Sequence, residues 1–324
     1  MPYATNVTQR YSSHYRWKLP QSDADFEKTF PTEEACKQRL FEMRWLKGFV
    51  CPSCKTEKNF TESTRDRLVC CHCQYRTTVA AGTMFAKSHM PLKLWFKAIW
   101  LLTSRESISS VTSLQQKLGL NYSTAWDWFH KLRKKMMPSN APLGIAEIGI
   151  TYLEHEKDAI GQRTKQTLIA VAADRDSKKR GVFHIKRIQD ASRETLREFI
   201  TETVSPGGII YTNKLKSADG LPGYVYRSPV RLQDRWGEPL RTYVQYVQEV
   251  GELLRKWLSD THPGAVDSEY LDYYLGEFAF RFGHTSARSH GKLFTDLLWR
   301  AVPRSAQHFP QRRKRVAEKV TATK

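Results

Sequence analysis

The sequence lacks an apolar run of even ~18 residues, the length that would mark a membrane-spanning helix. Residues 1–18 also lack the apolar core of a signal peptide, so we expect neither a membrane partner nor secretion. Acidic charge is scarce, because 33 aspartates and glutamates stand against 52 lysines and arginines, and the formal net charge is +19. Such a surplus is typical of a protein that binds a polyanion, most often nucleic acid.

Cysteine is sparse as well, with six in 324 residues. This number excludes a disulfide-rich secreted scaffold and favours a cytoplasmic protein. Four of the six form two C-x₂-C pairs that are separated by fifteen residues: Cys51 and Cys54, then Cys70 and Cys73. This spacing predicts a zinc ribbon, in which four thiolates bind one Zn²⁺ at ~2.3 Å and leave no open position, so the zinc is structural. A reduced cluster without metal is the alternative, and Cys36 and Cys71 are expected to be ordinary thiols.

Composition and periodicity divide the chain into successive parts. We expect a flexible arm over residues 1–24, a helix with the zinc ribbon over 25–90, a helical DNA-binding region over 91–137, an α/β domain over 144–302 and a basic tail over 303–324. The fold class is therefore multidomain α/β.

The segment before the ribbon is predicted to be helical over residues 26–45. Thr32 precedes two glutamates in the first turn, where acidic side chains complement the helix dipole. The apolar positions that recur at helical spacing are Cys36, Leu40 and Met43.

Two further helices are predicted over residues 109–118 and 123–136, with Gly119 suited to the left-handed residue of the turn between them. Ser123 is placed to cap the second helix. The apolar stripe of that helix is predicted to be Ala125, Trp126, Phe129 and Leu132. The pattern indicates a helix-turn-helix, and an ordinary helical hairpin is the alternative.

The second of these helices carries the predicted DNA contacts. Residues near its start are expected to reach base edges, and the basic side chains near its end are expected to meet phosphates. The base-contacting set is Ser123, Thr124 and Asp127. The basic set is Lys131 and Arg133 for phosphates, together with Lys134 and Lys135.

Beyond a proline-containing linker at residues 137–143, the periodicity changes. The runs GIAEIGITYL, TLIAVAAD and RGVFHIKRI indicate three strands, and GGIIYTN indicates a fourth. Residues 190–203 are expected to be a helix capped by Asp190 or Ser192. Strand–strand–strand–helix–strand is the opening order of an RNase H-like α/β fold.

Several runs in a fixed order carry a family resemblance: FEKTFPTEEACKQRLFEMRWLKGFVCPSC, the ribbon, GTMF, the helix-turn-helix and YLGEFAFRFG. Over residues 25–302 the chain resembles the zinc-ribbon DDE transposases of bacterial insertion sequences, a group related to eukaryotic Merlin elements. The resemblance implies that an RNase H-like domain cuts and joins DNA with two Mg²⁺ or Mn²⁺ ions held by carboxylates. It also implies double-stranded DNA with terminal inverted repeats as the partner, a nucleoid-associated location in a bacterium, and it is compatible with a homodimer.

The metal ligands of that family are not carried over intact. The family's first-strand motif V-E-I-D-E-T-Y resembles residues 146–152 and places Gly149 at the aspartate position. Its T-D-G motif resembles residues 212–214 and places Asn213 at the second aspartate. The third ligand falls at Gln248, or at Glu249 if the register slips by one. Because a hard cation needs anionic oxygen ligands, these replacements should weaken metal binding.

One route to an intact site stays open. Glu147 lies two residues before Gly149, hence on the same face of a strand, and is a candidate surrogate ligand with Asp219 as a second. Glu277 in YLGEFAF is expected to be a structural charge on a helix. Three functions follow: a transposase-derived DNA-binding protein that is inactive or domesticated, an active transposase with displaced ligands, or a protein-binding scaffold. The lost carboxylates favour the first.

Overall fold

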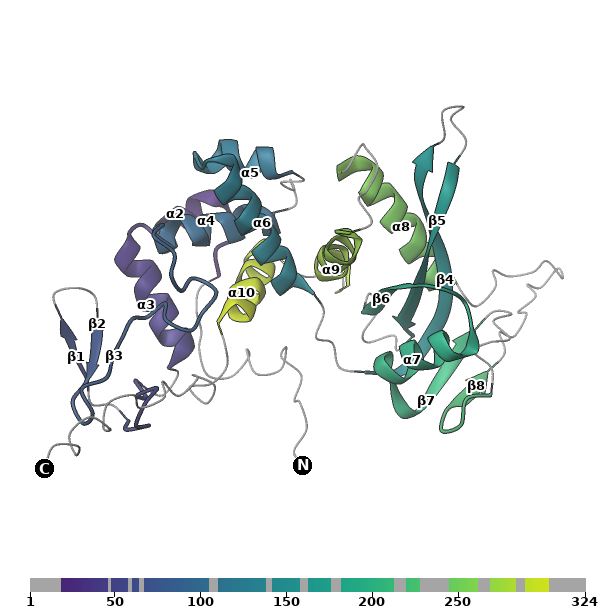
Figure 1. The fold of residues 1–324 in the computed structure, drawn as a ribbon, viewed down its shortest axis with the longest axis horizontal. Coiled ribbons are helices and arrows are strands. Elements are labelled where there is room, and N and C mark those ends of the chain that lie inside the picture. Colours follow the sequence, from purple (N-terminus) through teal and green to yellow (C-terminus); the bar gives the residue numbers. More distant parts are fainter. Residues whose placement is uncertain are drawn as a thin grey trace, which may run out of the picture. The chain divides into compact units, whose positions relative to one another are not determined.

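The computed structural model describes residues 19–45, 48–57, 60–63, 67–104, 110–137, 142–157, 163–175, 182–212, 220–227, 245–261, 269–283 and 289–302 (Figure 1). The chain forms two compact units, one of residues 22–99 with the segment from 295 onward, the other of residues 100–294 with the first 21. The division passes through helices α4 (Leu92–Thr103) and α10 (His290–Ala301). None of the described helices is both long and apolar enough for a bilayer crossing.

The ribbon unit begins with two short helices where the sequence predicted one. Helix α2 spans Asp23–Thr29 and is capped by Ser22, and helix α3 spans Glu33–Arg44 and is capped by Thr32. Pro31 explains the break, because the residue before a proline disfavours helical backbone. Thr32 Oγ1 accepts the N–H of Ala35 at 3.2 Å, and the two glutamates that follow Thr32 form the first turn as predicted.

The start of α2 shortens the expected arm of residues 1–24, of which residues 1–18 lie outside the described part. In α3 the predicted apolar stripe is confirmed, since three residues are buried: Cys36, Leu40 and Met43. Glu33 also caps the next helix, because its two carboxylate oxygens accept the N–H groups of Leu92 and Lys93 at 2.8 and 2.9 Å.

The ribbon itself is a three-stranded antiparallel sheet in the order β1 (Phe60–Ser63), β2 (Arg67–Cys70) and β3 (Arg76–Thr77). Its strands are two to four residues long. The buried cluster beneath them is small and consists of Trp45, Phe49, Cys51, Leu68 and Cys70. Two of these five side chains belong to the predicted zinc site, so little apolar core is left to hold the ribbon without metal.

The second unit contains a five-stranded mixed sheet in the order β6-β5-β4-β7-β8. Its elements are β4 (Leu143–Lys157), β5 (Arg163–Asp174), β6 (Phe183–Ile188), α7 (Arg193–Thr203), β7 (Val204–Thr212), β8 (Val225–Arg227), α8 (Gln245–Thr261) and α9 (Leu271–Phe282). Strands β4, β5 and β6 form an antiparallel meander, and β7 and β8 run parallel to β4. The predicted order of three strands, a helix and a strand is confirmed, with Ser192 as the cap of α7.

The two faces of this sheet have separate cores. One face packs against α8 and α9, and the other packs against α7. Alternation along β4 sends Ala146 and Ile148 toward α7, whereas Leu153 faces α8 and α9. Because side chains alternate with a period of two, Glu147 and Gly149 lie on the α8 face with Leu153.

Helices α5 (Val111–Leu118) and α6 (Tyr122–Met136) are joined at Gly119, whose φ of 64° is left-handed as predicted. The predicted cap at Ser123 is wrong. Asn121 caps α6 instead, because its Oδ1 accepts the N–H of Thr124 at 2.8 Å.

The predicted apolar stripe of α6 is wrong at one position. Trp126 is 40% exposed, and Trp128 is buried in its place beside the correctly predicted Ala125, Phe129 and Leu132.

Helix α6 packs on α9, so these helices are grouped with the sheet rather than in a DNA-binding region of their own over residues 91–137. Gly276 permits the approach, since a Cβ atom there would lie 2.9 Å from Cγ of Met137.

Candidate functional site

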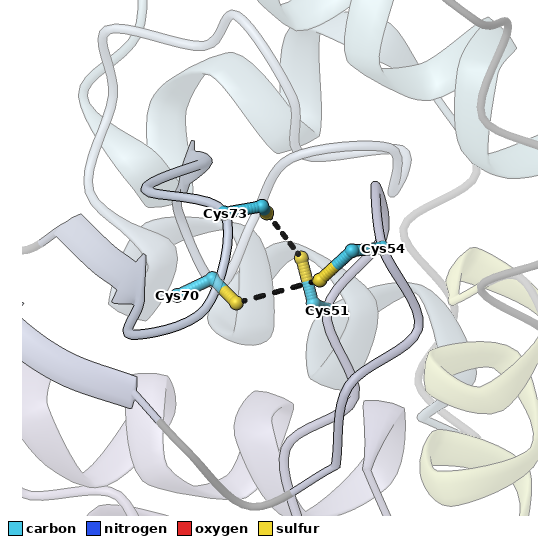
Figure 2. Close-up of side chains that lie close together, drawn as sticks. All are labelled: Cys51, Cys54, Cys70 and Cys73. Atoms are coloured by element: carbon cyan, nitrogen blue, oxygen red, sulfur yellow. Dashed lines mark hydrogen bonds between the residues drawn. The ribbon is translucent and has the colours of Figure 1, made fainter.

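The four ribbon cysteines lie on two equivalent turns. In the first turn, Lys55 donates its N–H to the Cys51 carbonyl at 3.0 Å, and in the second, Gln74 donates to the Cys70 carbonyl at 3.0 Å. Lys55 and Gln74 both have positive φ, 63° and 56°. The C-x₂-C sequence thus forms the same backbone twice and directs both thiol pairs inward (Figure 2).

The sulfur positions fit a tetrahedral zinc site. The Sγ atoms of Cys51 and Cys73 are 3.6 Å apart, and those of Cys54 and Cys70 are also 3.6 Å apart. All four lie within 4.8 Å of one another. Zn–S bonds of ~2.3 Å place tetrahedral ligands ~3.8 Å apart, close to these separations. The four cysteines predicted as ligands therefore form the site for one structural Zn²⁺.

The predicted DNA contacts on α6 differ in how exposed their side chains are. Ser123, Lys134 and Lys135 are exposed and Thr124 is partly buried. Asp127 and Lys131 are partly exposed and pair with each other, with Lys131 Nζ donating to Asp127 Oδ2 at 2.6 Å. These side chains are accessible to a duplex, although the Asp127–Lys131 pair must open or share its hydrogen bonds for both to meet DNA.

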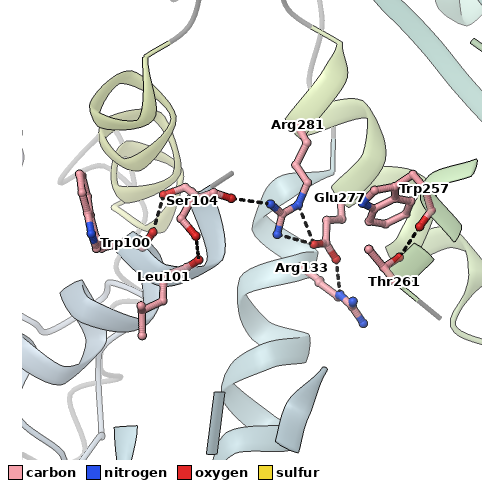
Figure 3. Close-up of polar contacts among 9 residues, drawn as sticks. Trp100, Leu101, Ser104, Arg133, Trp257, Thr261, Glu277 and Arg281 are labelled. Carbon is pink, nitrogen blue, oxygen red and sulfur yellow. Dashed lines mark hydrogen bonds and ion pairs between the residues drawn. The ribbon is translucent and has the colours of Figure 1, made fainter. Parts of the chain in front are cut away.

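The prediction that Arg133 contacts a DNA phosphate is wrong. It is 2% exposed, and its Nε donates to Glu277 Oε2 at 2.6 Å (Figure 3). Its guanidinium lies 4.0 Å from the ring centroid of Phe129. A guanidinium enclosed in this way has no exposed surface that a phosphate could contact. The phosphate prediction failed because Arg133 lies on the side of α6 that packs against α9.

Glu277 of α9 forms ion pairs with Arg133 of α6 and with Arg281 of its own helix. Burial alone would raise the pKa of Glu277, but the charges of Arg133 and Arg281 hold it below its ordinary value. Arg281 Nε donates to Glu277 Oε1 at 2.8 Å, and Arg281 Nη1 donates to the Ser104 carbonyl at 3.3 Å (Figure 3). Glu277 is therefore a buried structural charge.

At Gly149, where the family resemblance predicts a metal-binding aspartate, a side chain would meet helix α8. A Cβ atom on Gly149 would lie 2.7 Å from Val247 Cγ1, well inside a van der Waals contact of ~3.5–4.0 Å. A similar close approach occurs between Gly251 of α8 and Thr151 of β4, because a Cβ atom on Gly251 would lie 2.6 Å from Thr151 Oγ1. Arg255 Nη1 also donates to Thr151 Oγ1 at 2.8 Å. Helix α8 therefore packs directly against β4 at Gly149.

The other predicted ligand positions lie on α8 or outside the described residues. Val247 is the residue of α8 that lies at Gly149, whereas Gln248 and Glu249 are exposed. Asn213 and Asp219 lie outside the described residues, as does Lys214.

Glu147 shares the α8 face with Gly149, as predicted from their spacing. It is fully buried, and its Oε1 accepts the N–H of Val247 at 3.0 Å, in the first turn of α8. Its Oε2 is buried without a hydrogen-bond partner among the described residues. Burial raises the pKa of Glu147 to about 7, against the opposing effects of the Val247 N–H and the Arg175 charge.

We expect Glu147→Gln to change the pH dependence of stability. A raised pKa in an acid means that its protonated form stabilises the fold at low pH, and that this contribution is lost as pH rises through about 7. At pH 8 the variant should therefore be more stable than the wild type by up to about 3 kcal/mol, and the two should converge near pH 4.5. Urea unfolding from pH 4.5 to 8 measures this. The exposed Glu252→Gln on the same helix is the control, and equal pH profiles for both variants would contradict the prediction.

Two contacts in this region were not predicted from the sequence. Val247 reads as one more apolar residue of an amphipathic helix, and Arg175 reads as a loop cation although its guanidinium lies 4.1 Å from the Tyr211 ring centroid. Gly251 carried a usable signal, because a glycine inside a helical pattern often marks a close approach of another chain segment.

Two parts of the chain match known protein domains. Residues 31–76 match transposase zinc-ribbon domains, and residues 140–283 match ISXO2-like transposase domains. The "Uncharacterized protein in transposable element ISH50" of Halobacterium salinarum is 24% identical over 280 residues, which are 78% of this chain and 92% of that protein. A zinc ribbon followed by such a domain defines a transposase-type protein of insertion elements. These matches support a chain of the zinc-ribbon DDE transposase type.

Proposed function

We propose that this chain is a transposase-derived protein that binds double-stranded DNA and does not cut it. We infer that α5 and α6 form a DNA-binding helix-turn-helix and that the mixed sheet is RNase H-like. The left-handed Gly119 supports the first inference, and the meander followed by parallel strands supports the second. The observation that carries the proposal is the contact between Gly149 and Val247, because it fills the place where a metal-binding carboxylate would project.

An active transposase with displaced ligands is the second candidate, and Glu147 favours it as a carboxylate on the same face of β4 as Gly149. Its oxygen, however, is used to accept the Val247 N–H, and Gly149 beside it offers no side-chain ligand. One buried carboxylate is a poor site for Mg²⁺ or Mn²⁺, which take several oxygen ligands. Inactivity predicts that no Mg²⁺- or Mn²⁺-dependent cleavage or strand transfer occurs on the element's own terminal repeats. Cleavage that Glu147→Ala abolishes would overturn it.

The proposed DNA binding predicts a steep dependence on salt. Lys134→Ala should weaken binding to duplexes of any sequence and should reduce the slope of log affinity against log salt by about 1. Fluorescence anisotropy with an unrelated duplex at several salt concentrations measures both quantities. The matched control is Lys256→Ala, which removes an exposed lysine from α8. A protein-binding scaffold would instead show weak binding with no steep salt dependence, and Lys134→Ala would have no effect.

The closed site predicts the result of restoring the family residue. Gly149→Asp should lower the free energy of unfolding by about 1–3 kcal/mol, because the new side chain meets Val247 in a packed core. Adding Val247→Ala should return part of the loss, which a double-mutant cycle in urea detects. Gly144→Asp is the control, since Gly144 is exposed on the same strand with no atom within 4 Å of its Cβ position. Equal stability of the two aspartate variants would show that α8 leaves room for the ligand.

A further inference from the structure

Helix α6 exposes two aromatic rings that its helix-turn-helix role does not yet explain. Tyr122 is 55% exposed and Trp126 is 40% exposed. They are four residues apart, so they lie one above the other on the same side of the helix. Other large exposed apolar side chains among the described residues are scattered over separate elements, so this pair is distinguished by its shared face.

The ring of Trp126 packs against the rings of His130 and Tyr270. Its ring centroid lies 4.2 Å from that of His130 and 6.4 Å from that of Tyr270, with the Tyr270 ring at 89° to it. His130 in turn lies 4.9 Å from Tyr270. An exposed indole supported by two rings can present an apolar edge to a ligand at little cost in side-chain entropy.

Charge on the same helix indicates what the ligand is. Of the exposed lysines on α6, Lys134 lies nearest Trp126, about 80° around the helix, whereas Lys131 and Lys135 lie about 140° and 180° around it, in a chain of net charge +19. A surface that combines apolar rings with lysines fits the major groove of a duplex, where apolar base groups lie between phosphate strands. A second copy of the chain carries the same lysines on this surface and would place like charges opposite each other.

The side chains at the start of α6 restrict which base can be read. Residues 122–130 read YSTAWDWFH and contain no arginine, lysine, asparagine or glutamine. Guanine is usually read bidentately by arginine or lysine and adenine by asparagine or glutamine, so neither bidentate contact is available there, and Ser123 and Thr124 can add only single, less selective hydrogen bonds. The thymine methyl group is read by apolar contact, which Tyr122 and Trp126 can provide.

We propose that Trp126, with Tyr122, reads the 5-methyl group of thymine in the major groove and gives the protein a preference for thymine at one or two positions. This inference rests on the proposed DNA-binding role of α6. Asp127 does not replace this reading, because a carboxylate accepts from the amino group of cytosine and does not read thymine.

Substitution of uracil for thymine tests the proposal, since it removes the methyl group and keeps base pairing. The full chain with zinc first selects duplexes from a random library, and each thymine of the selected duplex is then replaced by uracil in turn. At one or two positions wild-type affinity should fall about fourfold, the value of one buried methyl group. Trp126→Ala should bind the thymine and uracil duplexes equally, while Trp126→Phe should keep a difference. Thermal unfolding of both variants checks that α6 is intact.

The outcomes separate this inference from the function beneath it. Failure to bind any duplex sinks the proposed function. Salt-dependent binding without an enriched sequence, or equal affinity for every uracil duplex, overturns thymine reading and leaves DNA binding in place. If Trp126→Ala changes the mass measured by light scattering and leaves the thymine preference intact, the aromatic surface is a contact between copies of the chain and the inference is wrong.

Discussion

Cys54→Ser, or removal of zinc by a chelator, is expected to abolish the ordered fold of residues 46–90. The buried cluster of the ribbon has five side chains, and two of them, Cys51 and Cys70, belong to the metal site. Structural zinc contributes about 10–16 kcal/mol in small ribbons and fingers, as much as the whole stability of many domains. Strands of two to four residues cannot replace that contribution. Limited proteolysis, with zinc measured by mass spectrometry, should show one zinc per chain and cleavage within the ribbon once it is lost.

Cys71→Ser is the matched control for this experiment. Cys71 stands between two ligands in sequence but is exposed and lies outside the four-cysteine cluster. It should keep one zinc per chain and the protease resistance of the wild type, and re-addition of zinc should restore the chelated wild type but not Cys54→Ser. Equal resistance of Cys54→Ser and Cys71→Ser, with zinc absent from the former, would show that the ribbon folds without metal.

The features that were predictable from the sequence depend on local chemistry. Thr32 caps α3 and Gly119 ends α5 because a hydroxyl or a glycine satisfies the backbone within a few residues. The C-x₂-C pairs belong to the same kind, since each forms its own turn. The succession of three strands, a helix and a strand along the chain followed from alternation and from the helical pattern of residues 190–203.

Two errors are local, namely the cap of α6 and the break before α3, and the others concern contacts between residues that are far apart in the chain. Arg133 was assigned to DNA because a cation near the end of such a helix usually meets phosphate, and its partner Glu277 is 144 residues away. Trp126 and Trp128 exchanged roles because both are apolar, and only the packing of α6 on α9 decides which is buried. The close approach of Val247 to Gly149 is likewise not visible in the strand motif around Gly149.

These long-range contacts have a common consequence for function. The same unit contains an accessible surface on α6 and a position on β4 from which a ligand side chain is excluded. An aspartate at Gly149 would meet the Val247 side chain, so it is expected to strain the packing of α8 on β4. The zinc ribbon, by contrast, keeps all four ligands at metal-binding separations. We infer that DNA binding is the activity that this chain retains.

Glu277→Ala should produce the largest loss of stability in the sheet unit. The substitution leaves Arg133 and Arg281 buried without their counter-ion, and breaking a buried ion pair in this way costs about 3–5 kcal/mol. Glu277→Gln should be less stable than the wild type and more stable than Glu277→Ala, because glutamine keeps hydrogen-bonding capacity and loses the charge. Since the pKa of Glu277 is lowered, the stabilising charge is present above its unfolded pKa and is lost as pH falls through the lower folded value, so the gap between wild type and Glu277→Gln should narrow in acid.

Asp272→Asn on the same helix provides the control, because Asp272 forms a surface pair with Arg187 at 3.4 Å. Exposed pairs of this kind contribute about 0–1 kcal/mol, so the control should unfold in urea close to the wild type. If Glu277→Ala were no less stable than Asp272→Asn, the buried pair would not be what holds α6 to α9. If the loss is found, DNA affinity should fall with it, because the position of α6 on the sheet unit depends on the contact between Arg133 and Glu277.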